Sequence, residues 1–274
     1  MSTSKVHSYL DGHPETKAAI TSILLNQPAV SGDDLVDKHM APMVAALFEQ
    51  ITAEVSPETL SKTQAAFYIQ ELSVFARYNS DFLRQAADTV QGGCMELAHE
   101  FRRNHLEEGG ERGKVPAHYT LYSGALLADL GLLVNGHIPA PETATLVSLH
   151  DWLVIGSSVS RICGGYYATE GVAIDETELL RKITDRYAAL TVGAEATTPN
   201  LDYYYSLHLD EGHEAAAVEG LSVEAAHIEG IARFIREYRT FGLDLPQIVD
   251  GWLQILEGMT FWWSQLATRA ATLP

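Results

Sequence analysis

Residues 104–118 read Asn-His-Leu-Glu-Glu-Gly-Gly-Glu-Arg-Gly-Lys-Val-Pro-Ala-His and connect two predicted helices. The first helix carries Glu108 in its last turn and ends at Gly109-Gly110, because glycine readily adopts the left-handed conformation of a helix C-cap. Pro116 is predicted near the first turn of the next helix, where the missing N–H costs nothing. Glu108 and His118 are therefore expected to face each other across a short connection.

Two carboxylates, Glu107 and Glu108, stand at the end of the first of these helices. Carboxylates at a helix C-terminus oppose the helix dipole, so something must compensate their charge. A solvated helix end and a bound cation both satisfy this requirement. The stretch alone leaves the two explanations open.

The composition describes a globular and strongly acidic chain. It has 274 residues, of which 46% are hydrophobic, enough to bury a sizeable core in one large domain or two small ones. The 36 acidic residues outnumber the 18 basic ones and give a net charge of −18. This charge argues against nucleic acid and anionic membranes as partners.

The cysteine count and the N-terminus predict a cytoplasmic protein. Cys94 and Cys163 are the only cysteines, too few for a disulfide framework. Residues 1–7 lack the apolar segment of a signal peptide, and the most apolar run, residues 146–162, is interrupted by charged side chains.

Long amphipathic segments dominate the chain and predict an all-α fold. Apolar residues recur at three- and four-residue steps, for example over residues 35–55, and no sustained period-two run predicts a strand. Short linkers favour antiparallel neighbours. We expect a single helical domain over residues 1–274, a bundle of seven to nine helices. Residues 1–30 would form a polar N-terminal extension with a short helix, and residues 57–271 the core bundle.

Further acidic and imidazole side chains lie on otherwise apolar segments. Glu170 follows small and aromatic residues, and a buried ionised carboxylate needs a cation or must stay protonated. Asp210 and His213, three residues apart, would share a helix face and address one ion. Each pair alone is more often structural. Together, carboxylates and imidazoles on successive helices favour a site for iron or manganese.

These residues resemble a known family, the haem-oxygenase-like diiron oxidases and oxygenases. Its first core helix has a region that often reads Asn-x-x-acid-Glu-x-Gly, with a histidine further on, and residues 104–110 followed by His118 are similar. The resemblance covers about residues 67–268. It implies a haem-oxygenase-like fold and a set of metal ligands, namely Glu108, His118, Glu170, Asp210 and His213, with His208 as a further candidate.

One position departs from the family pattern. The third ligand helix should begin its motif with a histidine at the position of Ser206, and serine is a poor metal ligand. His208 lies two residues later. At about 100° per residue it would lie about 200° from Asp210 on a regular helix, so a local bulge would be needed to bring both to one ion. The pattern therefore leaves the second iron site in doubt.

The resemblance implies an O2-dependent enzyme with two Fe(II) ions per chain, acting on a small amino-acid-like or carboxylate substrate in natural-product biosynthesis. N-oxygenation, desaturation and oxidative C–C cleavage are the expected reaction types, with an external electron donor and a homodimer as further expectations. Glu71, Arg161 and Tyr205 are candidates to support the ligands or the substrate. Two alternatives remain: a metal-free enzyme similar to the thiaminase and pyrroloquinoline-quinone synthase relatives, and a helical interaction protein without chemistry.

Overall fold

The computed structural model describes residues 4–110, 116–193, 195, 197–210 and 220–274, and these ranges contain helices and connections but no strand. The predicted all-α class is confirmed. Eleven α-helices of eight residues or more are present in the described residues, against seven to nine expected. Their bounds are α1 (Lys5–Gly12), α2 (Pro14–Leu24), α4 (Ala41–Val55), α5 (Lys62–Val90), α6 (Met95–Gly109), α7 (His118–Leu130), α8 (Pro141–Gly156), α9 (Val159–Thr191), α10 (Pro199–Leu209), α11 (Val223–Arg236) and α12 (Leu245–Ala270).

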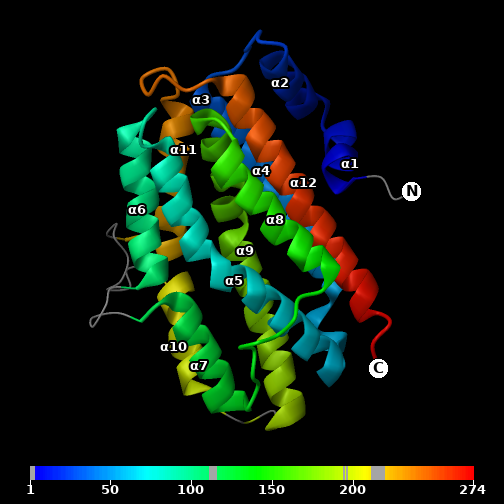
Figure 1. Ribbon diagram of the computed structural model, residues 1–274. Helices are drawn as coiled ribbons and strands as arrows, with labels where there is room; N and C mark the ends of the chain where they lie inside the picture. The colour runs from blue at the N-terminus through cyan, green and yellow to red at the C-terminus, as the bar shows by residue number, and fades with distance from the viewer. Residues whose placement is uncertain (1–3, 111–115, 194, 196, 211–219) are drawn as a thin grey trace.

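Three shorter helical turns complete the description. They are α3 (Gly32–Asp34), the π-helical segment η1 (Leu35–Met40) and the 3₁₀ turn η2 (Pro57–Thr59). The long helix α9 runs through the middle of the bundle, where α5 crosses it (Figure 1). Helices α4 and α12 pack on one side of α9, α6 and α11 lie towards the other, and α7 with α10 forms one end (Figure 1).

The contact between α9 and α12 depends on two glycines. A Cβ atom on Gly164 would lie 1.8 Å from the carbonyl oxygen of Ile248, and one on Gly251 would lie 2.2 Å from that of Arg161. Neither distance is sterically possible, so any larger residue would push the two backbones apart. The close approach fixes α9, the helix that carries Glu170, against the C-terminal helix.

Two serines, Ser157 and Ser158, separate two long helices. α8 ends at Gly156, and α9 runs without a break from Val159 through Asp175. The new helix starts at Ser158, whose side chain accepts a hydrogen bond from the Arg161 N–H. The Ser158 cap therefore determines where α9 begins.

The N-terminal segment is more than a polar extension. Residues 5–24 form two helices, α1 and α2, and not one, and they place Val6, Ile20 and Ile23 in the hydrophobic core. Both helices contact α12. In the part of the chain that the structure describes, no helix combines the length and apolar character needed to cross a bilayer.

Candidate metal centre

Six carboxylate and imidazole side chains meet in the interior of the bundle. One cluster consists of Glu108 (α6), His118 (α7) and His208 (α10), and the other of Glu170 (α9), Glu224 and His227 (both α11). Within each cluster, one potential ligand atom per residue lies within 4.8 Å of the other two. Five helices, two consecutive ones (α6 and α7) and three later ones (α9, α10 and α11), therefore converge on one site.

The first cluster has the spacing of ligands around a single ion. Nδ1 of His118 lies 3.3 Å from a carboxylate oxygen of Glu108 and 3.1 Å from Nε2 of His208. Bonds of about 2.0–2.2 Å to a first-row metal place neighbouring ligand atoms about 3–3.5 Å apart. The three side chains are buried or nearly so.

The second cluster adjoins the first. Nδ1 of His227 lies 3.5 Å from Glu170 and 3.9 Å from Glu224. Across the boundary, a Glu108 oxygen lies 4.0 Å from the same nitrogen, and a Glu224 oxygen lies 3.9 Å from Nε2 of His208. The two clusters thus form one continuous centre of three carboxylates and three imidazoles.

Two atoms of the second cluster are buried without a hydrogen-bond partner. They are Oε1 of Glu170 and Nδ1 of His227. Unpaired polar atoms in a protein interior are rare and costly, and a bound ion is one way to satisfy them. Nδ1 of His227 lies 3.5 Å from the other carboxylate oxygen of Glu170, so one cation bound between these two residues would satisfy both.

Hydrogen bonds outside the centre orient two of the histidines. Nδ1 of His208 lies 2.8 Å from the carbonyl oxygen of Tyr204, so Nδ1–H donates to it and Nε2 points to the centre with its lone pair. Nε2 of His227 lies 2.6 Å from Glu107, which leaves Nδ1 as the inward atom. Arg103 in turn holds Glu107. Such outer hydrogen bonds set the tautomer of metal-binding histidines.

The helix ends help to place these side chains. Asp129 of α7 accepts hydrogen bonds of 2.9 Å from the N–H groups of Asn200 and Leu201, which fixes the start of α10 and hence His208. Ser222 caps α11 by accepting from the Ala225 N–H. Glu224 then lies in the first turn of α11, where the helix dipole favours a negative charge.

The pKa shifts of the buried side chains indicate that the centre is arranged around a positive charge. Burial, and then the neighbouring Glu108, raise the pKa of Glu224. Burial also opposes ionisation of Glu108, but His118 beside it outweighs this and lowers the pKa of Glu108. Burial lowers the pKa of His208 to about 4, so this ring is neutral. Glu107 and Glu170 outweigh the burial of His227 and raise its pKa well above the usual value. A proton on His227 occupies the place that a metal ion would take.

The donor set fits first-row metal ions. Neutral imidazoles and carboxylates without thiolates suit iron and manganese, and a helical bundle with glutamates and a Glu-x-x-His pair is an established setting for two such ions. The orphaned atoms of Glu170 and His227 and the 3.1–3.5 Å spacings agree with this. The residues that are present therefore fit a dinuclear site.

The structure brings together four of the six ligands expected from sequence. They are Glu108, His118, Glu170 and His208. It does not bring Asp210 to the centre: α10 ends at Leu209, and Asp210 follows in an extended conformation with an exposed side chain. His213 lies outside the described residues. No helical bulge is needed for His208, because the buried face of α10 runs through Tyr204 and His208, one turn apart.

The three supporting candidates take other places. Glu71 accepts hydrogen bonds from the Ala140 N–H at 3.0 Å and from the Thr143 hydroxyl, and it fastens the start of α8 to α5. Arg161 pairs with Asp250 on α12 and stacks over Trp152. None of these contacts involves the six-residue centre.

Tyr205 lies in the core next to the α9 helix. Its hydroxyl is 2.8 Å from that of Thr184, and its ring contacts Tyr204. Because Tyr204 also touches His208 at 4.3 Å between ring centroids, Tyr205 reaches the centre only through a neighbour.

Two members of the centre were not identified from the sequence. They are Glu224 in the first turn of α11 and His227 one turn further along, both buried. The signal was present: Glu224-Ala-Ala-His227 has the three-residue spacing that places both side chains on one helix face.

A cavity of about 90 Å³ adjoins the centre. Four residues of the centre, Glu108, Glu170, His208 and Glu224, contribute to its wall. The rest of the wall comes from α5, α9 and α10: Leu72, Phe75, Ala76, Asn79, Thr169, Ala173, Glu176, Thr177, Leu180 and Tyr204. A small molecule bound there would contact the proposed metal ligands directly.

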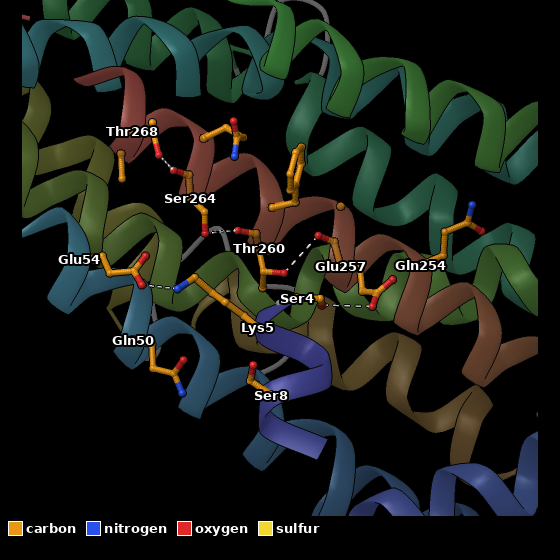
Figure 2. A pocket seen from close by; sticks show the side chains of 14 residues that line it. Ser4, Lys5, Ser8, Gln50, Glu54, Gln254, Glu257, Thr260, Ser264 and Thr268 are labelled. Atoms are coloured by element: carbon orange, nitrogen blue, oxygen red, sulfur yellow. Dashed lines mark hydrogen bonds and ion pairs between the residues drawn. The ribbon is translucent and has the colours of Figure 1, made fainter. Parts of the chain in front are cut away.

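A larger hollow lies elsewhere. A groove of about 930 Å³ runs between α1, α4 and α12 and is lined mostly by polar side chains (Figure 2). Lys5 pairs with Glu54 across it, and Ser4 contacts Glu257 (Figure 2). No histidine is among its lining residues, so it offers no cluster of the kind found in the centre.

Solved structures share this fold. Two crystal structures of a CADD-like protein of unknown function from Nostoc punctiforme PCC 73102 are similar to the chain, with 24% and 25% identity and TM-scores of 0.64 and 0.65. The alignments cover 94% and 93% of this chain and 96% and 98% of the relative. A domain of unknown function with a heme oxygenase-like fold from Shewanella denitrificans OS217 is 14% identical, with a TM-score of 0.60 and coverage of 89% and 93%.

The likeness to the Shewanella structure establishes a haem-oxygenase-like fold, as the sequence predicted. A search of curated proteins gives no significant match. The model of the family described as "Domain of Unknown Function with solved-structure structure (DUF3865)" matches residues 25–269, a range that includes all six residues of the centre. The chain therefore belongs to the DUF3865 family.

Proposed function

We propose that this protein is a non-haem diiron oxidase or oxygenase that uses O2 to oxidise a small organic molecule. The observation that carries the proposal is the buried centre in which Glu108, His118 and His208 adjoin Glu170, Glu224 and His227. Three carboxylates offset most of the charge of two Fe(II) ions. The bundle core holds the ligands in place, so the centre does not depend on the metal for its shape.

Each group of the chain has a definable task in such an enzyme. Bound iron would supply the one- and two-electron chemistry that activates O2. His208 presents a neutral imidazole, because its Nδ1–H is held by the Tyr204 carbonyl. Glu107 keeps Nδ1 of His227 free to bind a metal. Burial of the centre excludes bulk water, which strengthens every electrostatic interaction inside it.

The cavity beside the centre is the substrate site that we propose. It opens onto Glu108, Glu170, His208 and Glu224, so a molecule in it would lie beside the metal ions. Arg161, considered from sequence as a receiver of a substrate carboxylate, pairs with Asp250 and is absent from the wall. N-oxygenation, desaturation or oxidative cleavage of a small substrate, as in natural-product pathways, is the class of reaction we propose.

Oxygen consumption tests the proposal. Protein loaded anaerobically with Fe(II) should consume O2 faster in the presence of a reductant than the same protein loaded with Zn(II), which has no redox chemistry. His227→Ala loaded in the same way should lose the difference. If the Fe(II)-loaded and Zn(II)-loaded proteins consume O2 at the same rate with every panel of small molecules, the proposed oxidase function is wrong. A metal-free enzyme on the same scaffold would then be the better account if turnover persists without iron.

A further inference from the structure

A fourth carboxylate, outside the metal centre, reaches the cavity. Glu176 lies on α9 almost two turns beyond Glu170 and lines the cavity together with it. Its Oε1 accepts a hydrogen bond of 2.9 Å from the indole N–H of Trp263. Within the described residues no lysine, arginine or histidine forms an ion pair with Glu176, and Trp263 is its one hydrogen-bond donor.

A second unsatisfied acceptor faces the same space. Oδ1 of Asn79 on α5 is buried without a hydrogen-bond partner, and Asn79 also lines the cavity. An orphaned amide oxygen at a cavity wall is a place where a ligand can donate a hydrogen bond. Glu176 on α9 and Asn79 on α5 thus offer acceptors from two helices to the same cavity.

The surface around these acceptors is apolar. Leu72 and Phe75 of α5 and Ala173 and Leu180 of α9 contribute aliphatic and aromatic wall. Apart from His208 of the metal centre, no basic side chain is among the described residues that line the cavity. At the Glu176 end an anionic ligand would therefore meet a carboxylate without a compensating basic side chain, whereas a cation would be neutralised.

We propose that this cavity selects a substrate with an amine group, held as an ammonium ion by Glu176, and with a short aliphatic segment directed to the metal centre. The inference rests on the proposed function, because the metal centre gives the second end of the cavity its chemistry. The sequence predicted an amino-acid-like or carboxylate substrate, whereas this cavity would recognise the amine group of its substrate. Selection follows from the difference in pairing: an ammonium ion satisfies Glu176, an alcohol does so only by a neutral hydrogen bond, and a carboxylate repels it.

The pKa of Glu176 agrees with a carboxylate that has no basic side chain beside it. Burial raises its pKa to about 7, although the hydrogen bond from Trp263 acts in the opposite direction. An ordinary structural glutamate with a bound arginine or lysine would show the reverse shift. The missing partner is what an ammonium group would supply.

Binding of n-butylamine, n-butanol and butanoate tests the proposal. Isothermal titration of zinc-loaded and of metal-free protein should show that n-butylamine binds most tightly in both forms. Glu176→Gln keeps the size of the side chain and the acceptor for Trp263 but removes the charge. This variant should bind n-butylamine about tenfold or more weakly than the parent, which is the scale of a hydrogen bond to a charged group. Its affinity for n-butanol should be almost unchanged.

Glu178→Gln is the matched control, because Glu178 lies on the same helix with an exposed side chain outside the cavity. It should leave all three affinities as in the parent. The proposal is overturned if n-butylamine binds the parent no more tightly than n-butanol, or if Glu176→Gln retains the preference. Metal content is measured in the same samples. Loss of amine selectivity with normal metal content disproves only this inference, whereas failure to bind metal with intact amine selectivity disproves only the diiron function.

Discussion

Nε2 of His227 lies 2.6 Å from Oε2 of Glu107, and this contact determines which nitrogen of the ring faces the centre. Glu107 and Glu108 are neighbours at the end of α6 but have different surroundings. Glu108 is part of the centre, whereas Glu107 lies outside it and connects His227 to Arg103. The negative charge of Glu107 at this helix C-terminus is thus offset by His227 and Arg103. The charge of Glu108 faces the centre, where a bound cation would offset it.

Removing the Glu107 contact should weaken metal binding. In Glu107→Ala the ring of His227 is no longer fixed, and we expect Co(II) affinity to fall by about 10- to 100-fold, as for other outer partners of metal ligands. Glu107→Gln retains an acceptor and should lose less. Glu100→Gln is the control, because Glu100 binds Arg103 but not the histidine. Equal Co(II) affinity in the parent and in Glu107→Ala would show that this hydrogen bond does not orient a ligand.

Metal binding should release protons at pH 7. Burial and Glu108 raise the pKa of Glu224, and Glu107 and Glu170 outweigh the burial of His227 and raise its pKa, so both groups carry protons in the metal-free protein. A metal ion must displace these protons, and the apparent affinity therefore rises with pH until both groups are deprotonated. Each released proton contributes up to about tenfold per pH unit. Calorimetry in buffers of different ionisation enthalpy measures the proton count, and a count of zero contradicts this charge distribution.

Glu71 should matter for stability and not for metal binding. Its carboxylate satisfies the Ala140 N–H and the Thr143 hydroxyl where α8 begins. Glu71→Ala leaves both donors unpaired in the core, and we expect the free energy of unfolding to drop by about 3 kcal/mol. Glu49→Ala, at an exposed position, should change it by less than about 0.5 kcal/mol. If folded Glu71→Ala binds metal much more weakly than the parent, Glu71 supports the centre after all.

His208 and Asp210 give a direct contrast on one helix end. His208 is buried and 3.1 Å from His118, whereas Asp210 is exposed beyond the end of α10. His208→Ala should therefore lose one metal equivalent or bind it at least about tenfold more weakly. Asp210→Ala should titrate like the parent. The opposite pattern would mean that the chain after Leu209 folds onto the metal when it binds.

The sequence was sufficient for the fold class because the 3.6-residue pattern is clear in α4, α5, α6, α11 and α12, although it is weak in α7, α8 and α10. It also predicted that Glu108 and His118 face each other, and a carboxylate oxygen of Glu108 lies 3.3 Å from Nδ1 of His118. The sequence did not show that α10 ends at Leu209 and so leaves Asp210 outside the centre, because neither of the next two residues, Asp210 and Glu211, is a glycine or proline that would mark this end. His227 was not identified because the Glu224-x-x-His227 spacing carries no sign of Glu107 and Glu170, the carboxylates that α6 and α9 bring to this ring.

The most direct test is the amount of iron bound per chain after anaerobic loading with Fe(II) and removal of the excess. The account predicts about two equivalents in the parent and a large loss in Glu108→Ala/Glu170→Ala, which removes one carboxylate from each cluster. The helical circular dichroism of the variant should remain close to that of the parent, because the hydrophobic core and not the metal holds the bundle together. A parent that binds no iron, or a folded double variant that still binds two equivalents, would contradict the account.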